Sequence, residues 1–506
     1  MTSLPLLSAL WLTPLVGALV VVVLPGAARR AARPVALATS VLVLGLAVAL
    51  ALGFDPGGDP HQFVESHPWI PAFGATYTLG LDGLALVLVL LTAALMPLLL
   101  LAGWRDAEGR EHTYAALMLA TQSLVLVTFT SLDVLLFYVA FEAMLVPLYF
   151  LIGGFGGAGR ATAAVRFLLY NLLGGLVMLV AVIGLGMYTA RAGIGPDDGA
   201  TFDHRLITAA LADGRLDIPP GVALLLFGGF TLAFAIKAPL WPFHTWLPGA
   251  AVAATPASAV LMMAVVDKVG TFAMLRHSLP LFPGAAQTAA PWIIALAVVS
   301  IIYGGVMAIA QTDMLRLVAY ASISHFGFII MGVFALTEQA QAGSAFYMVS
   351  HGLATAALFL VAGFLARRRG SREIADFGGV QQVAPVLAGT FLVAGLATLS
   401  LPGLAPFISE FLVFVGTFGP YPVAAVLGTA TLVLAAVYVL WTYQRVIGGP
   451  VAPGVEGTAD LGARERLVLF PLVAALIVLG FAPQPALDVI EPAAAHTVAA
   501  VEGAAP

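Results

Sequence analysis

The stretch LAFAIKAPLWPFHTWLP, residues 232–248, places a single lysine, Lys237, beside three prolines in an otherwise apolar segment. Two of the prolines, Pro239 and Pro242, each remove a helical hydrogen bond and leave a carbonyl group without its partner. Inside a bilayer, such broken backbone is tolerated only where it is buried in protein or lines a water-filled space. The stretch therefore predicts an interrupted transmembrane helix with water beside a buried lysine. The alternative is a harmless kink with a snorkelling lysine, which the near-central place of Lys237 disfavours.

The composition of the whole chain is that of a membrane protein. Of its 506 residues, 61% are hydrophobic and 9% are charged, whereas a soluble domain has roughly 25% charged residues. Apolar runs of about 20 residues, enough to cross a bilayer core about 30 Å thick, recur along the chain. We predict an all-α polytopic membrane protein with about 14 transmembrane helices, the twelfth interrupted at LPGLAP. Their approximate cores are residues 4–25, 34–53, 78–103, 113–130, 132–153, 163–190, 220–247, 250–275, 290–311, 314–336, 342–366, 384–417, 420–446 and 466–484.

Charge and cysteine content exclude several function classes. The net charge is −5 with no long basic block, so nothing indicates nucleic-acid binding. The chain has no cysteine, which excludes disulfides, iron–sulfur ligation and thiolate metal sites. No phosphate-binding loop or dinucleotide fingerprint stands in a suitable context. The N-terminus MTSLPLLSALW lacks a basic region before its apolar run, so we expect a retained first helix.

The arginines predict the orientation in the membrane, because cytoplasmic loops carry an excess of basic residues. One set of alternate loops, which includes 54–77 and 191–219, holds only four arginines. All the other arginines fall in the opposite set, which includes ARRRGSRE at 366–373. We therefore expect both termini on the non-cytoplasmic side. The four arginines of the first set are Arg191, Arg205, Arg215 and Arg276.

Few ionisable residues lie inside the expected spans. A charge at the bilayer centre costs roughly 2.5–3.5 kcal/mol on insertion scales, so such residues usually face a bundle interior or a wet cavity and mark ion pathways. Ion pairs that serve packing alone are the alternative. The candidates are Glu142, Lys237, Lys268, His325, His351 and Glu410, and Asp267 is the ionisable neighbour of Lys268.

Glu142 and Lys237 have complementary chemistry. Glu142 shares one helical face with Tyr138 and Tyr149 in FYVAFEAMLVPLYF. Burial disfavours the charged form of either a lysine or a carboxylate, and an opposite charge nearby restores it. A lysine balanced between these effects can bind and release a proton near neutral pH, which is the property that a proton pump needs. Glu142 is thus a candidate proton site or charge partner of a lysine.

Lys268 needs partners from other helices, because the side chains of adjacent residues such as Asp267 diverge by about 100° on a helix. Histidines titrate near pH 6.5 and suit a proton relay. Histidines hydrogen-bonded only for packing are the alternative, and a metal site is a weaker one because no ligand spacing supports it. The tenth span offers a Ser–His pair, Ser322 and His325. The eleventh offers a polar stripe on one face, formed by Ser344, Tyr347, His351 and Thr355.

Glu410 follows a second proline-broken segment, LPGLAPFISEF. The segment at 232–248 and this one are five helices apart, and each carries one ionisable residue. Paired discontinuous helices that hold the sites are typical of transporters with internal repeats. We therefore expect an internal repeat, although the helices between the two segments match only weakly.

Six motifs together resemble the proton-pumping antiporter-like subunits of respiratory complex I, and within that group the M chain of NADH–quinone oxidoreductase. The resemblance covers nearly the whole chain. An acidic Glu410 stands where the L and N chains carry lysine, and the C-terminal tail also resembles the M chain. The motifs are SLDVLLFYVAFEAMLVPLYFLIGGFGG, FAIKAPLWPFHTWLP, DKVGTF, AYASISHFGF, SHGLATAALFL and LPGLAPFISEF.

The resemblance implies a fold of 14 helices with inverted five-helix repeats and two broken helices. The parts would be an N-terminal segment at 1–112, repeats at 113–288 and 289–446, and a C-terminal segment at 447–506. By this resemblance, Glu142 and Lys237 would form an ion pair, and Lys268 would be the central relay. His325 and His351 would carry protons along the midplane, and Glu410 would be the terminal site towards the outside.

The resemblance also implies partners and location. The chain would hold no redox cofactor, because NADH, FMN, iron–sulfur clusters and quinone belong to partner subunits. Its neighbours would be other complex I subunits, especially the L and N chains, in a bacterial plasma membrane. One departure is GAAVAATPASAV at 249–260, which lacks the acid and histidine usual in relatives and puts a role of this loop in proton entry in doubt.

Two other functions remain as alternatives. A subunit of a multi-subunit cation/proton antiporter would share the core lysines, but Glu410 and the tail favour the complex I reading. A membrane scaffold without transport gains little from buried charges, since each carries an insertion cost.

Overall fold

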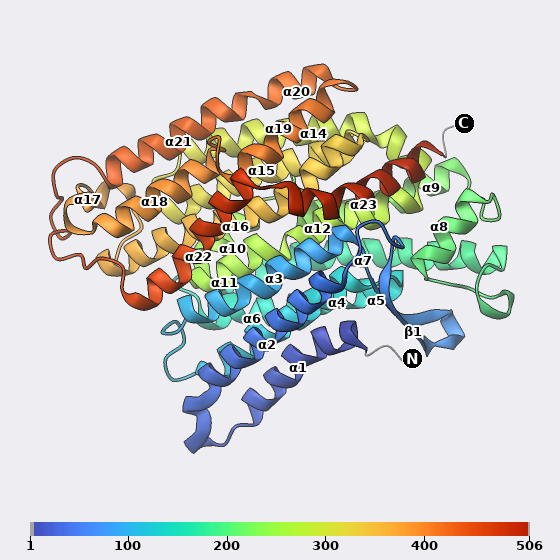
Figure 1. The fold of residues 1–506 in the computed structure, drawn as a ribbon, viewed down its shortest axis with the longest axis horizontal. Helices are drawn as coiled ribbons and strands as arrows, with labels where there is room; N and C mark the ends of the chain where they lie inside the picture. Colours follow the sequence, from blue (N-terminus) through green and yellow to red (C-terminus); the bar gives the residue numbers. More distant parts are fainter. Residues whose placement is uncertain (1–4, 504–506) are drawn as a thin grey trace.

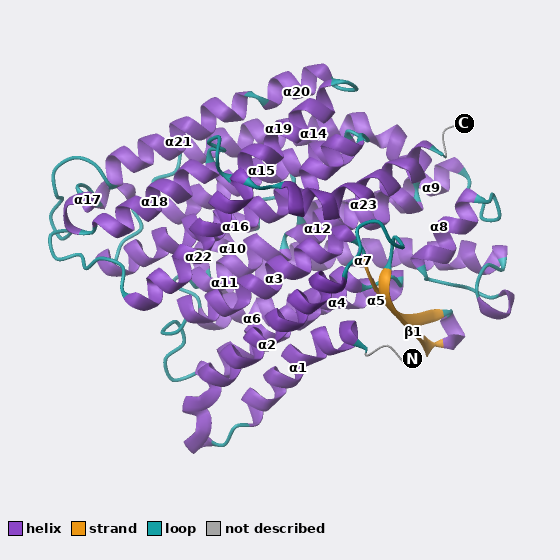
Figure 2. Ribbon diagram, viewed as in Figure 1, coloured by secondary structure: helices purple, strands orange, loops and turns teal. Residues whose placement is uncertain are grey.

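The computed structural model describes residues 5–503, which form a bundle of helices with one small antiparallel sheet (Figure 2). Within these residues, twelve helical segments are long and apolar enough to cross a membrane, and the bent pair α22–α23 is a thirteenth candidate. The shorter apolar helices α18 and α19 occupy the place of the expected interrupted span. The all-α membrane fold predicted from the sequence is therefore confirmed.

The helices and strands follow one another along the whole described chain, and most of the expected cores coincide with them. In order they are α1 (Leu6–Val23), α2 (Ala32–Gly53), β1 (Gln62–Ile70), β2 (Ala75–Leu81), α3 (Gly83–Ala102), α4 (Glu111–Thr130), α5 (Val134–Ala143), α6 (Leu145–Phe155), α7 (Arg160–Ala192), α8 (His204–Ala212), α9 (Pro220–Lys237), α10 (Leu247–Ala253), α11 (Pro256–Val260), α12 (Lys268–Ala273), α13 (Leu279–Leu281), α14 (Pro283–Ile309), α15 (Met314–Phe334), α16 (Glu338–Arg369), α17 (Val380–Val383), α18 (Pro385–Thr398), α19 (Ala405–Phe418), α20 (Pro422–Gly428), α21 (Ala430–Val446), α22 (Ala463–Phe481) and α23 (Gln484–Glu502).

The two ends of the bundle differ. Figure 1 shows the start of α1 and the end of α23 at one end of the bundle, together with β1 and α8, and we call this end the terminal face. The short helix α17 and the loop after α21 lie at the opposite end. The basic end of α16 contacts that loop, because Arg368 donates to the carbonyl of Ala459 at 2.8 Å. The arginine-rich segment 366–373 therefore lies at the end of the bundle opposite the terminal face.

A β-hairpin occupies most of the expected loop 54–77 and the first residues of the expected third span. β1 and β2 pair antiparallel, with Glu65 opposite Leu79. Asp82 then caps α3 by accepting a hydrogen bond from the backbone N–H of Ala85 at 2.8 Å. The prediction of helix from residue 78 is wrong, because the polar–apolar alternation of TYTLGL favours a strand and the cap fixes the helix start at Gly83.

Both proline-broken spans are interrupted as expected, and a backbone hydrogen bond closes the end of the first helix in each. After α9, the backbone N–H of Leu240 donates to the carbonyl of Ala235 at 3.0 Å. After α18, Leu401 donates to Leu396 in the same way, also at 3.0 Å. Trp246 adds a side-chain bond at the first break, from Nε1 to the carbonyl of Ile236 at 3.0 Å. The Ala235 carbonyl, which Pro239 frees, thus bonds to a backbone amide five residues later, and water beside Lys237 stays a prediction.

The interior of the bundle is built from its central spans. The span Pro256–Leu281 is wholly buried, and α15 and α16 are nearly so. The outer helices α2 and α7 instead expose rows of Leu and Val, as lipid- or protein-facing helices do. The ionisable residues of the central spans are thus enclosed by other helices.

The C-terminal region contains one helix that the sequence did not predict. After α22, the chain turns by 70° into α23. α23 packs on α3 and α16 and reaches the terminal face (Figure 1). Asp488, Glu491 and His496 interrupt its apolar run, which is why hydropathy alone did not identify it.

Candidate functional site

The six candidate residues come from six different helices that meet in the interior. Lys237 and Lys268 are completely buried, and His325, His351 and Glu410 nearly so. Gly270 lets α12 pack directly on the end of α9, since a Cβ there would lie 2.6 Å from the carbonyl oxygen of Phe234. Close packing of these two helices brings the lysine-bearing segments together.

Lys268 lies directly after a π-helical turn, Leu261–Val266. Such turns often occur at functional sites. The ammonium group of Lys268 donates to the carbonyl of Met263 at 2.8 Å and contacts Nδ1 of His351 at 2.6 Å. It also stands 4.4 Å from the ring centre of Phe326, a favourable place for a cation. Lys268 is therefore held at one end of a polar chain.

His351 continues this chain on α16. A charged lysine can only donate, so Nδ1 of His351 accepts from it and the ring proton resides on Nε2. Nε2 lies 3.2 Å from the hydroxyl of Ser322 and 3.1 Å from that of Thr355. The expected polar face of α16 thus points at α12 and α15.

His325, Tyr347 and Glu410 form the second half of the chain. The hydroxyl of Tyr347 donates to Oε1 of Glu410 and lies 2.5 Å from Nδ1 of His325. On the other side of the imidazole, Nε2 of His325 lies 3.4 Å from the hydroxyl of Tyr438. His325 and Glu410 also approach each other directly, with Nδ1 and Oε1 3.6 Å apart.

A single gap separates the two halves. The ring centres of His325 and His351 are 5.3 Å apart, without a direct hydrogen bond between them. A small rotation of one ring, or one bridging water, would join Lys268 to Glu410.

Glu142 and Lys237 do not form the direct ion pair that the resemblance implied. Within the described residues, neither Lys237 Nζ nor Glu142 Oε1 has a hydrogen-bond partner. Lys237 instead stands 4.6 Å from the ring centre of Phe141. The Glu142 carboxylate rests against Gly175 of α7, which offers no side chain to hold it away. The aromatic ring takes the place that the carboxylate was expected to fill.

Several polar residues of the interior were missed or set aside. Tyr438 was not considered, because one tyrosine in an apolar helix gives no pattern. Asp267 was set aside because it cannot face Lys268, yet it is fully buried and neither of its oxygens has a partner in the described chain. Arg276 was counted with a loop, but it lies within the span Pro256–Leu281 and pairs with Asp82 at 2.6 Å. Arg276 could have been found from the sequence, because the polar residues RHS interrupt an apolar run there.

In the part of the chain that the structure describes, no group of three or more His, Asp or Glu residues could hold a metal ion. What the interior does offer is a line of groups that can each take up or release a proton.

Comparison with known proteins agrees with this arrangement. The family model of the NADH:quinone oxidoreductase/Mrp antiporter transmembrane domain matches residues 131–435. NADH-quinone oxidoreductase subunit M of Mycobacterium tuberculosis is 57% identical over 99% of this chain and 95% of its own length.

Two solved structures have the same fold. A chain of respiratory complex I from Thermus thermophilus superposes with a TM-score of 0.87 at 32% identity, covering 98% of this chain and 99% of the other. A chain of the Mrp complex from Dietzia sp. DQ12-45-1b superposes with a TM-score of 0.82 at 21% identity, covering 99% of this chain and 100% of the other.

Proposed function

This chain belongs to the NADH:quinone oxidoreductase/Mrp antiporter transmembrane family, and on that premise we propose that its protons move through the buried residues between Lys237 and Glu410. It is a proton-translocating membrane subunit of NADH–quinone oxidoreductase, and its partners are other subunits of that complex. NADH, FMN, iron–sulfur clusters and quinone would bind in those subunits. The immediate neighbours would be the L and N chains.

One observation carries the proposal: buried titratable groups lie in hydrogen-bond contact from Lys268 to His351, and again from His325 through Tyr347 to Glu410. Each group is costly to place in a membrane interior. A packing role would not require two such lines, separated by a single gap, of groups that both accept and donate protons.

The roles follow from the chemistry of each group. Lys268 donates to His351, whose second nitrogen faces hydroxyl groups, so a proton can enter one nitrogen while another leaves the opposite one. Tyr347 can pass a proton between His325 and the Glu410 carboxylate. Glu410 would be the terminal site of this line.

Lys237 and Glu142 would form the other part of the pathway. Glu142 and Asp267 are the two carboxylates close enough to act electrostatically on Lys237. Since Lys237 has no hydrogen-bond partner in the described chain, its charge would depend on which of these carboxylates is ionised. Because Asp267 interacts electrostatically with both lysines, a change of charge on Lys237 would alter the proton affinity of Lys268 through the ionisation of Asp267.

We propose the repeats 113–288 and 289–446 as the two halves of the pathway, between an N-terminal segment at 1–112 and a C-terminal segment at 447–506. The two interrupted spans support this division, because in each of them the first helix ends with a backbone hydrogen bond between residues five positions apart. The excess of arginine opposite the termini supports termini on the non-cytoplasmic side of a bacterial plasma membrane.

A subunit of a cation/proton antiporter is the second candidate, because the Mrp chain has the same fold. Its 21% identity carries the fold alone, whereas the M. tuberculosis subunit M is 57% identical. The redox-linked function is therefore the better supported of the two.

The test replaces Lys237 or Glu142 with alanine in the assembled complex in proteoliposomes. We expect both variants to assemble and to lose most NADH-driven proton pumping, together with coupled quinone reduction. Glu491→Ala, an exposed carboxylate on α23, is the matched control and should pump normally. Wild-type pumping by an assembled Lys237→Ala complex would contradict the proposal.

A further inference from the structure

Three histidines near the terminal face form a row that the pathway above does not use. His277 follows α12 and is completely buried, and His204 at the start of α8 is 5% exposed. Their ring centres are 5.5 Å apart, and that of His61 lies 6.5 Å from His204. We call His277, His204 and His61 the histidine row.

The inner two histidines are not satisfied by packing. Both ring nitrogens of His204 and of His277 lack a hydrogen-bond partner in the described chain. A neutral imidazole always carries one N–H, so each ring buries a donor and an acceptor without compensation. Buried polar groups of this kind are rare and call for a role.

The charges around the row are already paired with each other. Arg276 lies 2.6 Å from Asp82, and Arg205 lies 2.6 Å from Asp203. Burial, with Arg276 nearby, lowers the pKa of His204 to about 3. His204 is therefore neutral at pH 7, and the paired arginines leave no free positive charge to hold an anion.

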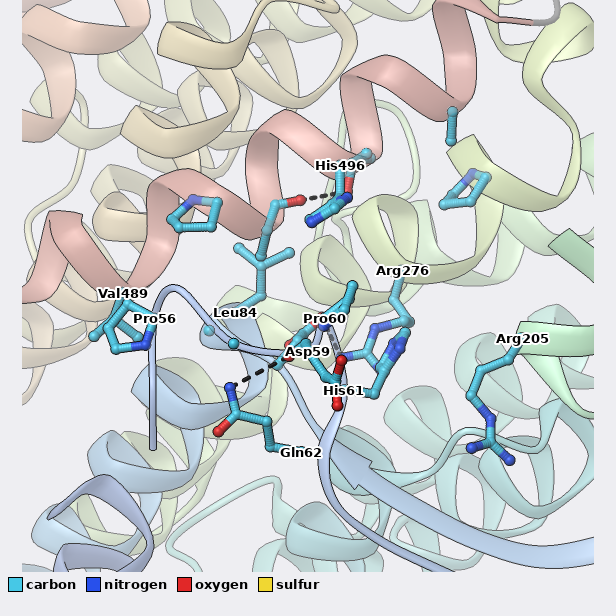
Figure 3. Close-up of a pocket in the computed structure, with 18 of the residues that line it drawn as sticks. Pro56, Asp59, Pro60, His61, Gln62, Leu84, Arg205, Arg276, Val489 and His496 are labelled. Carbon is cyan, nitrogen blue, oxygen red and sulfur yellow. Dashed lines mark hydrogen bonds and ion pairs between the residues drawn. The ribbon is translucent and has the colours of Figure 1, made fainter. Parts of the chain in front are cut away.

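The outer end of the row opens into a cavity of about 710 Å³. His61, His204 and Arg276 line it on one side, and α23 lines it from Val489 to Ala500. Figure 3 shows His61 and Arg276 directed into this space below α23. Protons at the terminal face can thus reach the row.

The inner end of the row stops at aromatic rings. The ring centre of Phe137 lies 4.3 Å from that of His277 and 5.6 Å from that of Phe141. Phe141 in turn contacts the ammonium group of Lys237. Phe137 therefore stands between His277 and Phe141, the ring that the Lys237 ammonium group touches.

We propose that the histidine row is a second proton-conducting branch, which joins Lys237 to the cavity at the terminal face and is closed in this structure by Phe137. The proposal rests on proton translocation by this chain. When the Phe137 ring swings aside, the Lys237 ammonium gives one proton towards His277 and becomes a neutral amine. Each imidazole takes a proton on one nitrogen and releases the proton of the other, so that one proton reaches the cavity. Single waters can bridge the spaces between rings.

The first test measures protons pumped per NADH in proteoliposomes that contain the assembled complex. His277→Leu and His204→Leu remove the titratable rings and keep apolar volume, so we expect both to lower this ratio. His67→Leu, an exposed histidine of β1, is the matched control and should keep it. A wild-type ratio in both His277→Leu and His204→Leu would overturn the branch. If Lys237→Ala abolished pumping in the same assay, proton translocation itself would stand.

The second test opens the branch. Phe137→Ala should create a passive proton leak in proteoliposomes without NADH, at least about 10²-fold above wild type, the low end of what one proton-transfer group contributes. The double variant Phe137→Ala, His277→Leu should lose that leak. Phe227→Ala, a buried phenylalanine that packs on Phe334, is the control for loosened packing. A leak that persists in the double variant, or an equal leak in Phe227→Ala, would overturn the role of the row. Phe137→Leu replaces Phe137→Ala if the latter fails to assemble.

Discussion

Replacing Gly175 with alanine tests whether the position of the Glu142 carboxylate matters, without changing any charged group. A Cβ at Gly175 would lie 1.8 Å from Glu142 Oε1, whereas ordinary contact begins at 3.4 Å. The carboxylate must therefore retreat by about 1.6 Å, the difference between these distances. It is the free end of a flexible side chain, so the movement costs about 0.5–1.5 kcal/mol of rotamer strain. The higher helix propensity of alanine offsets part of this cost.

The functional effect should be larger than the effect on stability. A displacement of about 1 Å can slow a reaction about 10²-fold when geometry is critical. We expect Gly175→Ala to lower NADH-driven proton pumping at least about tenfold in proteoliposomes, measured with a pH-sensitive dye, while Tm of the complex changes little.

The matched control is Gly228→Ala on α9, where an added Cβ meets nothing within 4 Å. It changes helix propensity in the same way and should pump normally. Normal pumping by Gly175→Ala, with pumping lost in Glu142→Ala, would refute the reasoning, because the carboxylate would then act independently of its position. A large fall in Tm would instead show that the substitution disturbs packing.

Three further predictions concern other parts of the interior. Glu410→Gln should impair coupled turnover more than Asp267→Asn, because Glu410 accepts the Tyr347 hydrogen bond and Asp267 has no such partner. Equal losses in NADH oxidation assays would contradict this prediction. Tyr347→Phe removes the hydroxyl between His325 and Glu410 and should slow proton pumping about tenfold or more, since a hydrogen bond to a charged group contributes about 1.5–3 kcal/mol; unchanged pumping would exclude Tyr347 from the line. The pKa of His204 is about 3 when folded and near 6.5 when unfolded, so between these values the unfolded chain binds the extra proton and stability falls as pH falls. At pH 5 the loss is about 2 kcal/mol relative to pH 7, and thermal unfolding of His204→Leu should depend less steeply on pH; parallel curves for the variant and wild type would contradict the buried, neutral state of His204.

Several features could be predicted from local sequence. The membrane class and the spans follow from apolar runs, because insertion into a bilayer depends on each segment by itself. The two interruptions follow from prolines, which remove hydrogen bonds wherever they stand. Buried charges such as Lys237 and Lys268 are candidates for function from sequence alone, because their insertion cost depends mainly on depth in the span.

Contacts between distant segments could not be predicted in this way. The β-hairpin, α23 and the bond that closes the break after Lys237 each depend on neighbours brought in by folding. The same holds for Phe141, which occupies the place beside Lys237 expected for Glu142.

The sequence by itself determined that this chain is a helical membrane protein with titratable residues at specific depths in its spans. Only the tertiary structure decided which of those residues touch, from Lys268 to His351 and from His325 to Glu410. It alone placed His277 and His204 in one row, although 73 residues separate their numbers. The physical reason is that hydropathy and insertion cost belong to single segments, whereas a proton pathway depends on distances of a few ångströms between segments that only packing brings together.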